Sequence, residues 1–257
     1  MIKFEPKRSY QTLGLILRKE LCDGLYPIGS RLPPERDIAE RLNVGRTVVR
    51  EAIIMLELEN LVEVKKGSGV YVINLPKEVH ESPSLNFDRD VGPFEMLQAR
   101  QLLESSIAEF AAIQVTPSDI SKMQEALDIE RHEVASGSIS SSGDRSFHLC
   151  IAEATQNLIL VDMFNQLWEK RESSPMWNKL HGHIDNGDYR KEWFNDHAHI
   201  LLALKRKDPA AAKLAMWQHL ENVKVTLLEL SDFNDPHFDG YLFDSVPAVL
   251  LPKEKIR

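Results

Sequence analysis

Apolar residues recur at helical spacing in three short segments near the beginning of the chain. Leucines at four-residue intervals form one stripe within residues 9–23 and predict a first amphipathic helix. A pair of prolines predicts the start of a second helix over residues 34–42, because proline is tolerated at the first positions of a helix. The turn Asn43–Val44–Gly45, which contains residues suited to positive φ, then leads into a third helix from Arg46 to about Leu58.

The next segment changes from helical to alternating spacing. Apolar residues alternate through LVEVKKGSGVYVI, around a tip of Lys66–Gly67–Ser68–Gly69, which predicts a β-hairpin with a basic, glycine-rich turn. Three short helices followed by a two-stranded wing are typical of a winged helix-turn-helix, in which the third helix enters the major groove of DNA.

The rest of the chain is predicted to be helical. Its helices are expected at roughly 93–114, 117–136, 143–154, 157–172, 189–206 and 208–230. The fold class is therefore mainly α, with an N-terminal winged helix-turn-helix and a C-terminal all-α antiparallel helical bundle. The predicted domains are a DNA-binding domain at 1–74, a linker at 75–91, a helical effector domain at 92–231 and a tail at 232–257.

Composition fits a folded protein that is not embedded in a membrane. Hydrophobic residues make up 43% of the 257 positions and charged residues 27%. No run approaches the ~18 apolar residues of a membrane span, and the N-terminus lacks the apolar core of a secretory signal. The two cysteines, Cys22 and Cys150, fall in different predicted domains, so we expect a reduced, cytoplasmic protein without a membrane partner.

Charge is distributed unevenly between the two parts of the chain. The net charge of −8 argues against nucleic acid, because DNA repels an acidic body. Residues 1–75, however, hold 12 basic and 10 acidic residues, a balance of +2, whereas the remainder holds 19 basic and 29 acidic residues, a balance of −10. Only the N-terminal part is suited to face phosphates.

The third predicted helix carries the residues best suited to read DNA. Arg46 and Arg50 are four positions apart and project from one face, and an arginine can donate two hydrogen bonds to guanine. Arg36, Thr47 and the tip Lys65–Lys66–Gly67 are candidates for phosphate or groove-edge contacts. The alternative is that these arginines form surface ion pairs with Glu35, Glu40 or Glu51.

Four residues of the helical part are candidate metal ligands. Asp144 and His148 are four positions apart on one helix, and antiparallel packing of the last two helices brings His197 and His219 to a common point. Three imidazoles and one carboxylate suit Zn²⁺, Ni²⁺ or Mn²⁺. The alternative is a buried histidine hydrogen-bonded to an aspartate.

The N-terminal segment LPPERDIAERLNVGRTVVREAIIMLELENLVEVKKGSGVYV resembles the DNA-binding domain of GntR-type bacterial regulators over some forty residues. Gly45 departs from the small hydroxylated residue that the family often has there. The resemblance implies DNA contacts by Arg36, Arg46, Thr47 and Arg50, with Lys66 and Gly67 at the wing tip.

The segments PFEMLQARQLLESSIAEFAA, DRSFH, DHAHILLAL and AMWQHLENV resemble the effector domain of the FadR-type branch, known as the FCD domain. That resemblance implies that an acidic effector is bound by Arg100, for which the alternative is an intrahelical pair with Glu104. His199 lies two positions beyond His197 and points elsewhere on a helix, so we place it outside the ligand set. The four tryptophans are expected to be packing residues, one of which borders the pocket. The implied metal site, with Zn²⁺ ahead of Ni²⁺ or Mn²⁺, consists of Asp144, His148, His197 and His219, and the three histidines also line the effector pocket.

A closer resemblance extends over nearly the whole chain. SSPMWNKLH, YRKEW, KLAMWQHLENVK and FDGYLFDS are similar to repressors of hexuronate operons in enterobacteria. This implies a homodimer that binds a palindromic operator in double-stranded DNA and is released by a sugar acid such as glucuronate, fructuronate or galacturonate. Two other hypotheses are a metal-dependent enzyme acting on sugar acids and a DNA-binding protein that needs no effector.

Overall fold

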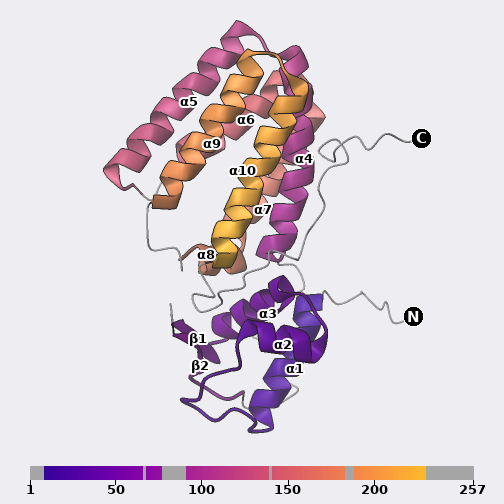
Figure 1. Cartoon of the computed structure of the whole chain (residues 1–257), viewed down its shortest axis with the longest axis vertical. Coiled ribbons are helices and arrows are strands. Elements are labelled where there is room, and N and C mark those ends of the chain that lie inside the picture. Colours follow the sequence, from indigo (N-terminus) through magenta and orange to yellow (C-terminus); the bar gives the residue numbers. More distant parts are fainter. Residues whose placement is uncertain (1–8, 66–67, 77–90, 139–140, 183–187, 230–257) are drawn as a thin grey trace, which may run out of the picture. The chain divides into compact units, whose positions relative to one another are not determined.

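The structure is a computed structural model that describes residues 9–65, 68–76, 91–138, 141–182 and 188–229. The chain divides into two compact units (Figure 1). The first contains the described residues within Met1–Glu95, Glu172–Ile184 and Leu227–Leu242, and the second contains those within Met96–Arg171 and Asp185–Thr226. Most of the predicted linker and the whole predicted tail lie outside the described residues, so their boundaries stay predictions.

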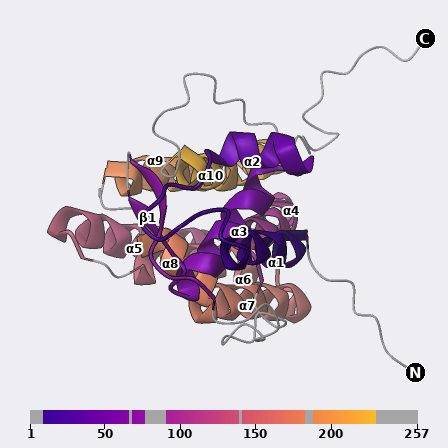
Figure 2. The same cartoon turned by 90° about the horizontal axis from the view of Figure 1, so that it is seen from below.

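The N-terminal part of the first unit has the three helices and the hairpin that the sequence predicts. Helix α3 packs against α1 and α2 (Figure 2), and β1 pairs with β2 in an antiparallel register that places Val62 opposite Val72. Apolar residues from all five elements form one core, including the leucine stripe of α1. The elements are α1 (Ser9–Cys22), α2 (Glu35–Leu42), α3 (Arg46–Leu58), β1 (Val62–Lys65) and β2 (Gly69–Val72).

The turn between α2 and α3 differs in detail from the prediction. Helix α2 begins at Glu35, so the prolines precede the first turn, and Pro34 is its N-cap. Asn43 adopts the left-handed conformation at φ 51°, which asparagine tolerates better than most residues. Gly45 has φ −70°, a value open to any residue, so no positive φ requires glycine there.

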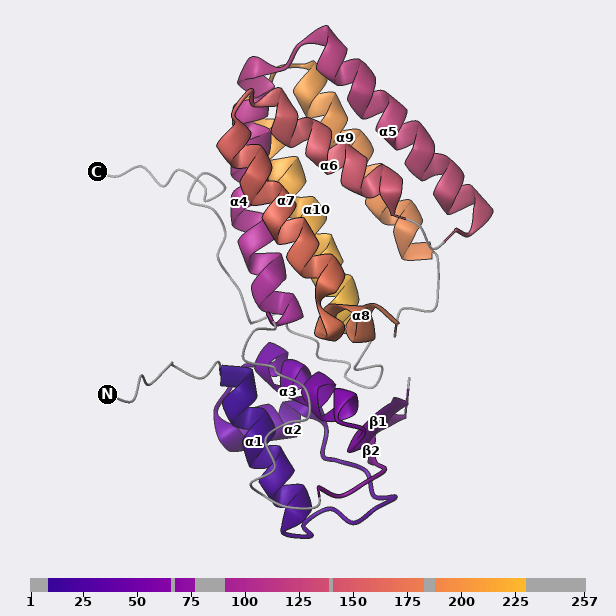
Figure 3. The same ribbon diagram turned by 180° about the vertical axis from the view of Figure 1, so that it is seen from behind.

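The six predicted helices of the C-terminal part are all present, with ends within one residue of the prediction. In the second unit, α5 packs against α6 and α9 (Figure 3). None of the described helices has the length and apolar character needed to cross a membrane. The six are α4 (Pro93–Gln114), α5 (Pro117–Ser136), α6 (Ser142–Ala154), α7 (Leu158–Ser173), α9 (Asp188–Lys205) and α10 (Pro209–Glu229).

A seventh helix, α8 (Pro175–Gly182), belongs to the first unit and was missed by the sequence reasoning. It buries Met176, Trp177 and Leu180. Two local signals mark its start: proline occupies the first position, and the Ser174 hydroxyl accepts a hydrogen bond from the backbone N–H of Trp177 at 3.1 Å.

Helices α5 and α6 pack closely at Gly143. A Cβ atom at this position would lie 2.4 Å from the backbone nitrogen of Glu130, so only glycine allows the observed spacing. This close packing sets α6, which carries Asp144 and His148, against the part of α5 that carries Glu130.

Candidate functional site

Two of the predicted DNA-contacting arginines are accessible. Arg46 opens α3 and is partly exposed. Arg36 on α2 has a side chain that is 53% exposed and lies 3.5 Å from the Asp37 carboxylate and 3.9 Å from that of Glu40. Such exposed ion pairs contribute little free energy, so a DNA phosphate competes with them easily.

Thr47 and Arg50 are buried, each 2% exposed. The Nε and Nη2 atoms of Arg50 donate to the two carboxylate oxygens of Glu35 at 3.1 and 2.5 Å. Within the same unit, its Nη1 donates to the carbonyl oxygens of Leu228 at 2.7 Å and Leu227 at 3.2 Å. Arg50 thus has the ion pair of the alternative interpretation, and the predicted DNA contacts of both residues stay predictions. The wing-tip residues Lys66 and Gly67 lie outside the described residues.

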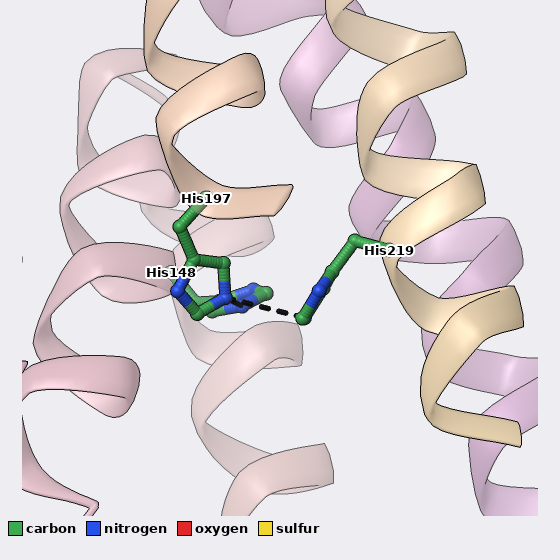
Figure 4. A group of neighbouring side chains, drawn as sticks. All are labelled: His148, His197 and His219. Carbon is green, nitrogen blue, oxygen red and sulfur yellow. Dashed lines mark hydrogen bonds between the residues drawn. The ribbon is translucent and has the colours of Figure 1, made fainter. Parts of the chain in front are cut away.

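Three buried histidines converge in the second unit, from α6, α9 and α10 (Figure 4). The Nε2 atom of His197 lies 3.1 Å from that of His148 and 3.2 Å from that of His219. One ligand atom from each ring lies within 4.8 Å of the other two. His199 is exposed and is not part of this group, as predicted.

Each imidazole also has a carboxylate at its other ring nitrogen. Nδ1 of His148 lies 2.5 Å from Oε2 of Glu104, and Nδ1 of His197 lies 2.8 Å from Oε2 of Glu130. Nδ1 of His219 lies 3.4 Å from Oδ2 of Asp196, an ion-pair distance that is long for a hydrogen bond. Because a carboxylate only accepts, His148 and His197 carry their proton on Nδ1 and direct an Nε2 lone pair at the common point.

This arrangement fits a metal ion. The unprotonated Nε2 atoms of His148 and His197 lie 3.1 Å apart and repel each other unless a cation lies between them. Ligands at the usual zinc–nitrogen distance of about 2.0–2.1 Å in a tetrahedron lie roughly 3.3–3.4 Å apart, close to the observed spacing. Oδ1 of Asp144 lies 3.5 Å from Nε2 of His148 and 3.7 Å from Nε2 of His197, beside the same point. The histidine triad can therefore hold a metal ion.

Electrostatics around the triad keep the carboxylates charged. Burial raises the pKa of Glu104, but Arg100 and His148 outweigh that effect and lower it to about 2. Burial likewise raises the pKa of Asp144, and the charges of His148 and Arg171 hold it well below its usual range. Charged carboxylates around a histidine cluster are the state that attracts a divalent ion.

Two of the histidines have pKa values shifted in opposite directions. Burial lowers the pKa of His197, but the hydrogen bond and charge of Glu130 raise it overall. Burial and the neighbouring His197 lower the pKa of His219 to about 3, so its imidazole is neutral at neutral pH. A neutral imidazole is the form that binds a metal.

Arg100 lies next to the triad and is already paired. Its Nε donates to Oε1 of Glu104 at 2.6 Å, and its Nη2 lies 3.4 Å from Oε2. The guanidinium carbon lies 5.0 Å from the centre of the Trp168 ring, and that ring lies 6.0 Å from the His148 ring. The intrahelical pair is therefore present. Arg100 can still bind an effector while paired with Glu104, because a guanidinium has five N–H donors. Trp168 therefore borders this site.

The sequence reasoning missed the carboxylates that support the histidines. Glu104 was considered only as a partner of Arg100, while Glu130 and Asp196 were not considered. No fixed sequence spacing connects Glu130 with His197, which lies 67 positions later. The only usable signal was the general tendency of metal-binding histidines to have a carboxylate behind them.

The fold and the site together define a class of protein. A winged helix-turn-helix followed by a helical domain with a metal-competent histidine triad is the architecture of a DNA-binding transcriptional regulator. Residues 9–72 match the gntR family of bacterial regulatory proteins, and residues 95–222 match the FCD domain. The chain belongs to the GntR family and carries an FCD domain, as the sequence resemblance indicated.

Curated relatives agree over almost the full length. The chain is 58% identical to the Uxu operon transcriptional regulator of Escherichia coli K12, over 94% of this chain and 95% of the relative. It is 49% identical to the Exu regulon transcriptional regulator of the same strain, over 96% and 95%. A Uxu operon regulator of Haemophilus influenzae is 52% identical, over 95% and 91%. These relatives are regulators, so the chain is a transcriptional regulator and the enzyme hypothesis is set aside.

Proposed function

We propose that this protein represses genes of hexuronate catabolism and is released from its operator by a sugar acid such as glucuronate, fructuronate or galacturonate. The observation that carries the proposal is a buried site in which Arg100 lies beside a metal-competent histidine triad. The relatives named as Uxu and Exu regulators, which match over more than nine-tenths of the chain, support the choice of regulon.

A uronate has the chemistry that this site is suited to bind. Zn²⁺, or alternatively Ni²⁺ or Mn²⁺, would be held by His148, His197 and His219 together with Asp144. When bound, the ion would supply a Lewis acid for an oxygen of the sugar acid. Arg100 provides a planar fork that matches a carboxylate, so the effector's anionic end is held from two sides.

The DNA partner is a palindromic operator read by a homodimer, because two third helices must meet two half-sites. Arg36 and Arg46 are the accessible members of the predicted contact set. Thr47, Arg50, Lys66 and Gly67 complete that set as the resemblance implies it. Together they supply the positive face that the acidic remainder of the chain lacks.

The dimer contact is assigned to an apolar face on α4 and α7. These helices are neighbours, since Arg100 on α4 packs over Trp168 on α7. Four large apolar side chains on them are between 55% and 79% exposed, and we propose that they take part in the contact between two copies. A second copy of the chain is the partner that twofold reading of DNA requires. The four are Leu102, Ile113, Leu158 and Ile159.

The direct test is release of operator DNA by the effector. A fluorescent fragment carrying the operator is bound by the zinc-loaded protein and titrated with D-fructuronate, D-glucuronate or D-galacturonate while anisotropy is followed. One of these acids should dissociate the complex at millimolar concentration or below, whereas glucose should not. If none of the acids releases DNA or raises the melting temperature, the protein binds DNA without an effector and the proposal is wrong.

Arg100→Lys separates effector binding from DNA binding. Lysine keeps the charge that Glu104 needs but loses the bidentate fork, so the uronate concentration for half-release should rise about 10-fold or more. Operator affinity without uronate should stay unchanged. An unchanged uronate concentration for half-release would show that Arg100 does not bind the effector.

A further inference from the structure

Glu104 contacts both a histidine of the triad and the neighbouring arginine. Its Oε2 lies 2.5 Å from Nδ1 of His148, and its Oε1 accepts from Nε of Arg100 at 2.6 Å. Its side chain is 3% exposed, so water does not substitute for either partner. One carboxylate therefore meets two donors from two helices, α4 and α6.

We infer that Glu104 is a positioning residue that links the two parts of the effector site. It fixes the tautomer of His148 that binds a divalent ion and holds Arg100 in place for a carboxylate anion. The inference rests on the proposed function. Beyond the proposed function, the inference states that binding of the metal ion and binding of the effector anion both depend on the buried side chain of Glu104.

A carboxylate has two acceptor oxygens and no donor, and both partners approach it with N–H groups. The acceptor at Nδ1 keeps the proton there and leaves the Nε2 lone pair of His148 free for a metal ion. The second oxygen fixes the plane of the Arg100 guanidinium, which already packs over Trp168.

An amide of the same shape cannot serve both partners. In Glu104→Gln, an amide oxygen facing His148 leaves the NH₂ group facing the Nε–H of Arg100, where two donors oppose each other. In the reverse orientation the NH₂ group faces Nδ1, the imidazole proton moves to Nε2, and the metal-binding lone pair is lost. Either orientation damages one of the two binding functions.

Glu130 provides a matched control on the same metal site. Its Oε2 lies 2.8 Å from Nδ1 of His197, whereas Arg100 is paired with Glu104. In Glu130→Gln the amide oxygen can still accept from His197, so the tautomer is retained. This control separates the effect of losing a charge near the metal from the effect of losing the second acceptor.

The experiment compares Glu104→Gln, Glu130→Gln and the wild-type protein. Zn²⁺ affinity is measured by competition with a chelator, ligand number by the visible absorption of the Co²⁺-loaded protein, and D-fructuronate or D-glucuronate binding by calorimetry. For Glu104→Gln we expect a 10- to 100-fold loss in Zn²⁺ affinity, an altered Co²⁺ spectrum, or a loss of at least 10-fold in uronate affinity. Glu130→Gln also removes a charge beside the metal, so it should lower Zn²⁺ affinity, but by less than Glu104→Gln does, and it should keep the Co²⁺ spectrum of the wild type.

The result that overturns the inference is a Glu104→Gln protein that binds Zn²⁺ and uronate no worse than Glu130→Gln. If Glu104→Gln is unfolded, as shown by loss of its helical circular dichroism, Glu104→Asp is used instead, because aspartate keeps two acceptor oxygens. The inference then requires the Glu104→Asp protein to retain the wild-type Co²⁺ spectrum. A wild-type protein that binds Zn²⁺ but no uronate contradicts the proposed function instead, and the Zn²⁺ comparison still decides the role of Glu104 at His148.

Discussion

Gly143→Ala tests the close packing of α5 against α6 that brings the metal site together. Two effects of opposite sign compete in this substitution. Alanine is favoured over glycine within a helix by up to about 1 kcal/mol. The added Cβ, however, would lie 2.4 Å from the backbone nitrogen and 2.6 Å from the Cα of Glu130, and backbone atoms of a packed helix cannot swing aside.

The steric effect should win. Overpacking a well-filled interior costs about 1–3 kcal/mol, so the net loss in free energy of unfolding is about 1–2 kcal/mol. For a domain of this size, each kcal/mol lowers the melting temperature by roughly 2–4 °C. Zn²⁺ affinity should fall as well, because the helices that move apart carry Asp144, His148 and Glu130.

The assay is urea denaturation followed by tryptophan fluorescence. Trp168, Trp193 and Trp217 lie in the second unit, so the signal reports mainly on the helices in question. Gly182→Ala is the matched control, because a Cβ there meets nothing within 4 Å and the variant should be as stable as the wild type. A Gly143→Ala protein with unchanged or higher stability would refute the reasoning.

Three further predictions concern DNA, metal and assembly. Arg46→Ala should lower operator affinity and remove the preference for operator over unrelated DNA. The melting temperature should not change, because the Arg46 side chain is partly exposed. Fluorescence anisotropy with both DNAs measures the two affinities, and unchanged selectivity would contradict a base-reading role for Arg46. His219→Ala should abolish the rise in melting temperature that Zn²⁺ causes in chelator-treated protein, a stabilisation of about 2.7 kcal/mol when free Zn²⁺ is 100 times its Kd. His199→Ala, which changes an exposed histidine outside the triad, should keep the rise, and equal loss in both variants would rule out the assigned ligands. Leu158→Glu should shift the dimer toward monomer in sedimentation velocity, whereas Leu214→Glu, at an exposed position on α10, should not. If both variants remain dimeric, the dimer contact does not include Leu158 on α7.

Much of the fold could be predicted because its signals are local. Helical spacing, proline and the glycine-rich hairpin located the winged helix-turn-helix and six C-terminal helices. Helix α8 was missed although Ser174 and Pro175 mark its start, because an eight-residue helix next to a serine pair is too short to give a clear helical pattern. Convergence of His148, His197 and His219 was also predicted, and the structure confirms it.

The sequence by itself determined the helices, the wing and the residues able to bind a metal, since these depend on spacing along the chain and on side-chain chemistry. Only the tertiary structure decided which carboxylates support the histidines and that Arg50 pairs with Glu35. The physical reason is that hydrogen bonds between helices depend on how closely those helices pack, as Gly143 illustrates for α5 and α6. That distance is a property of the whole packed core, and no local pattern records it.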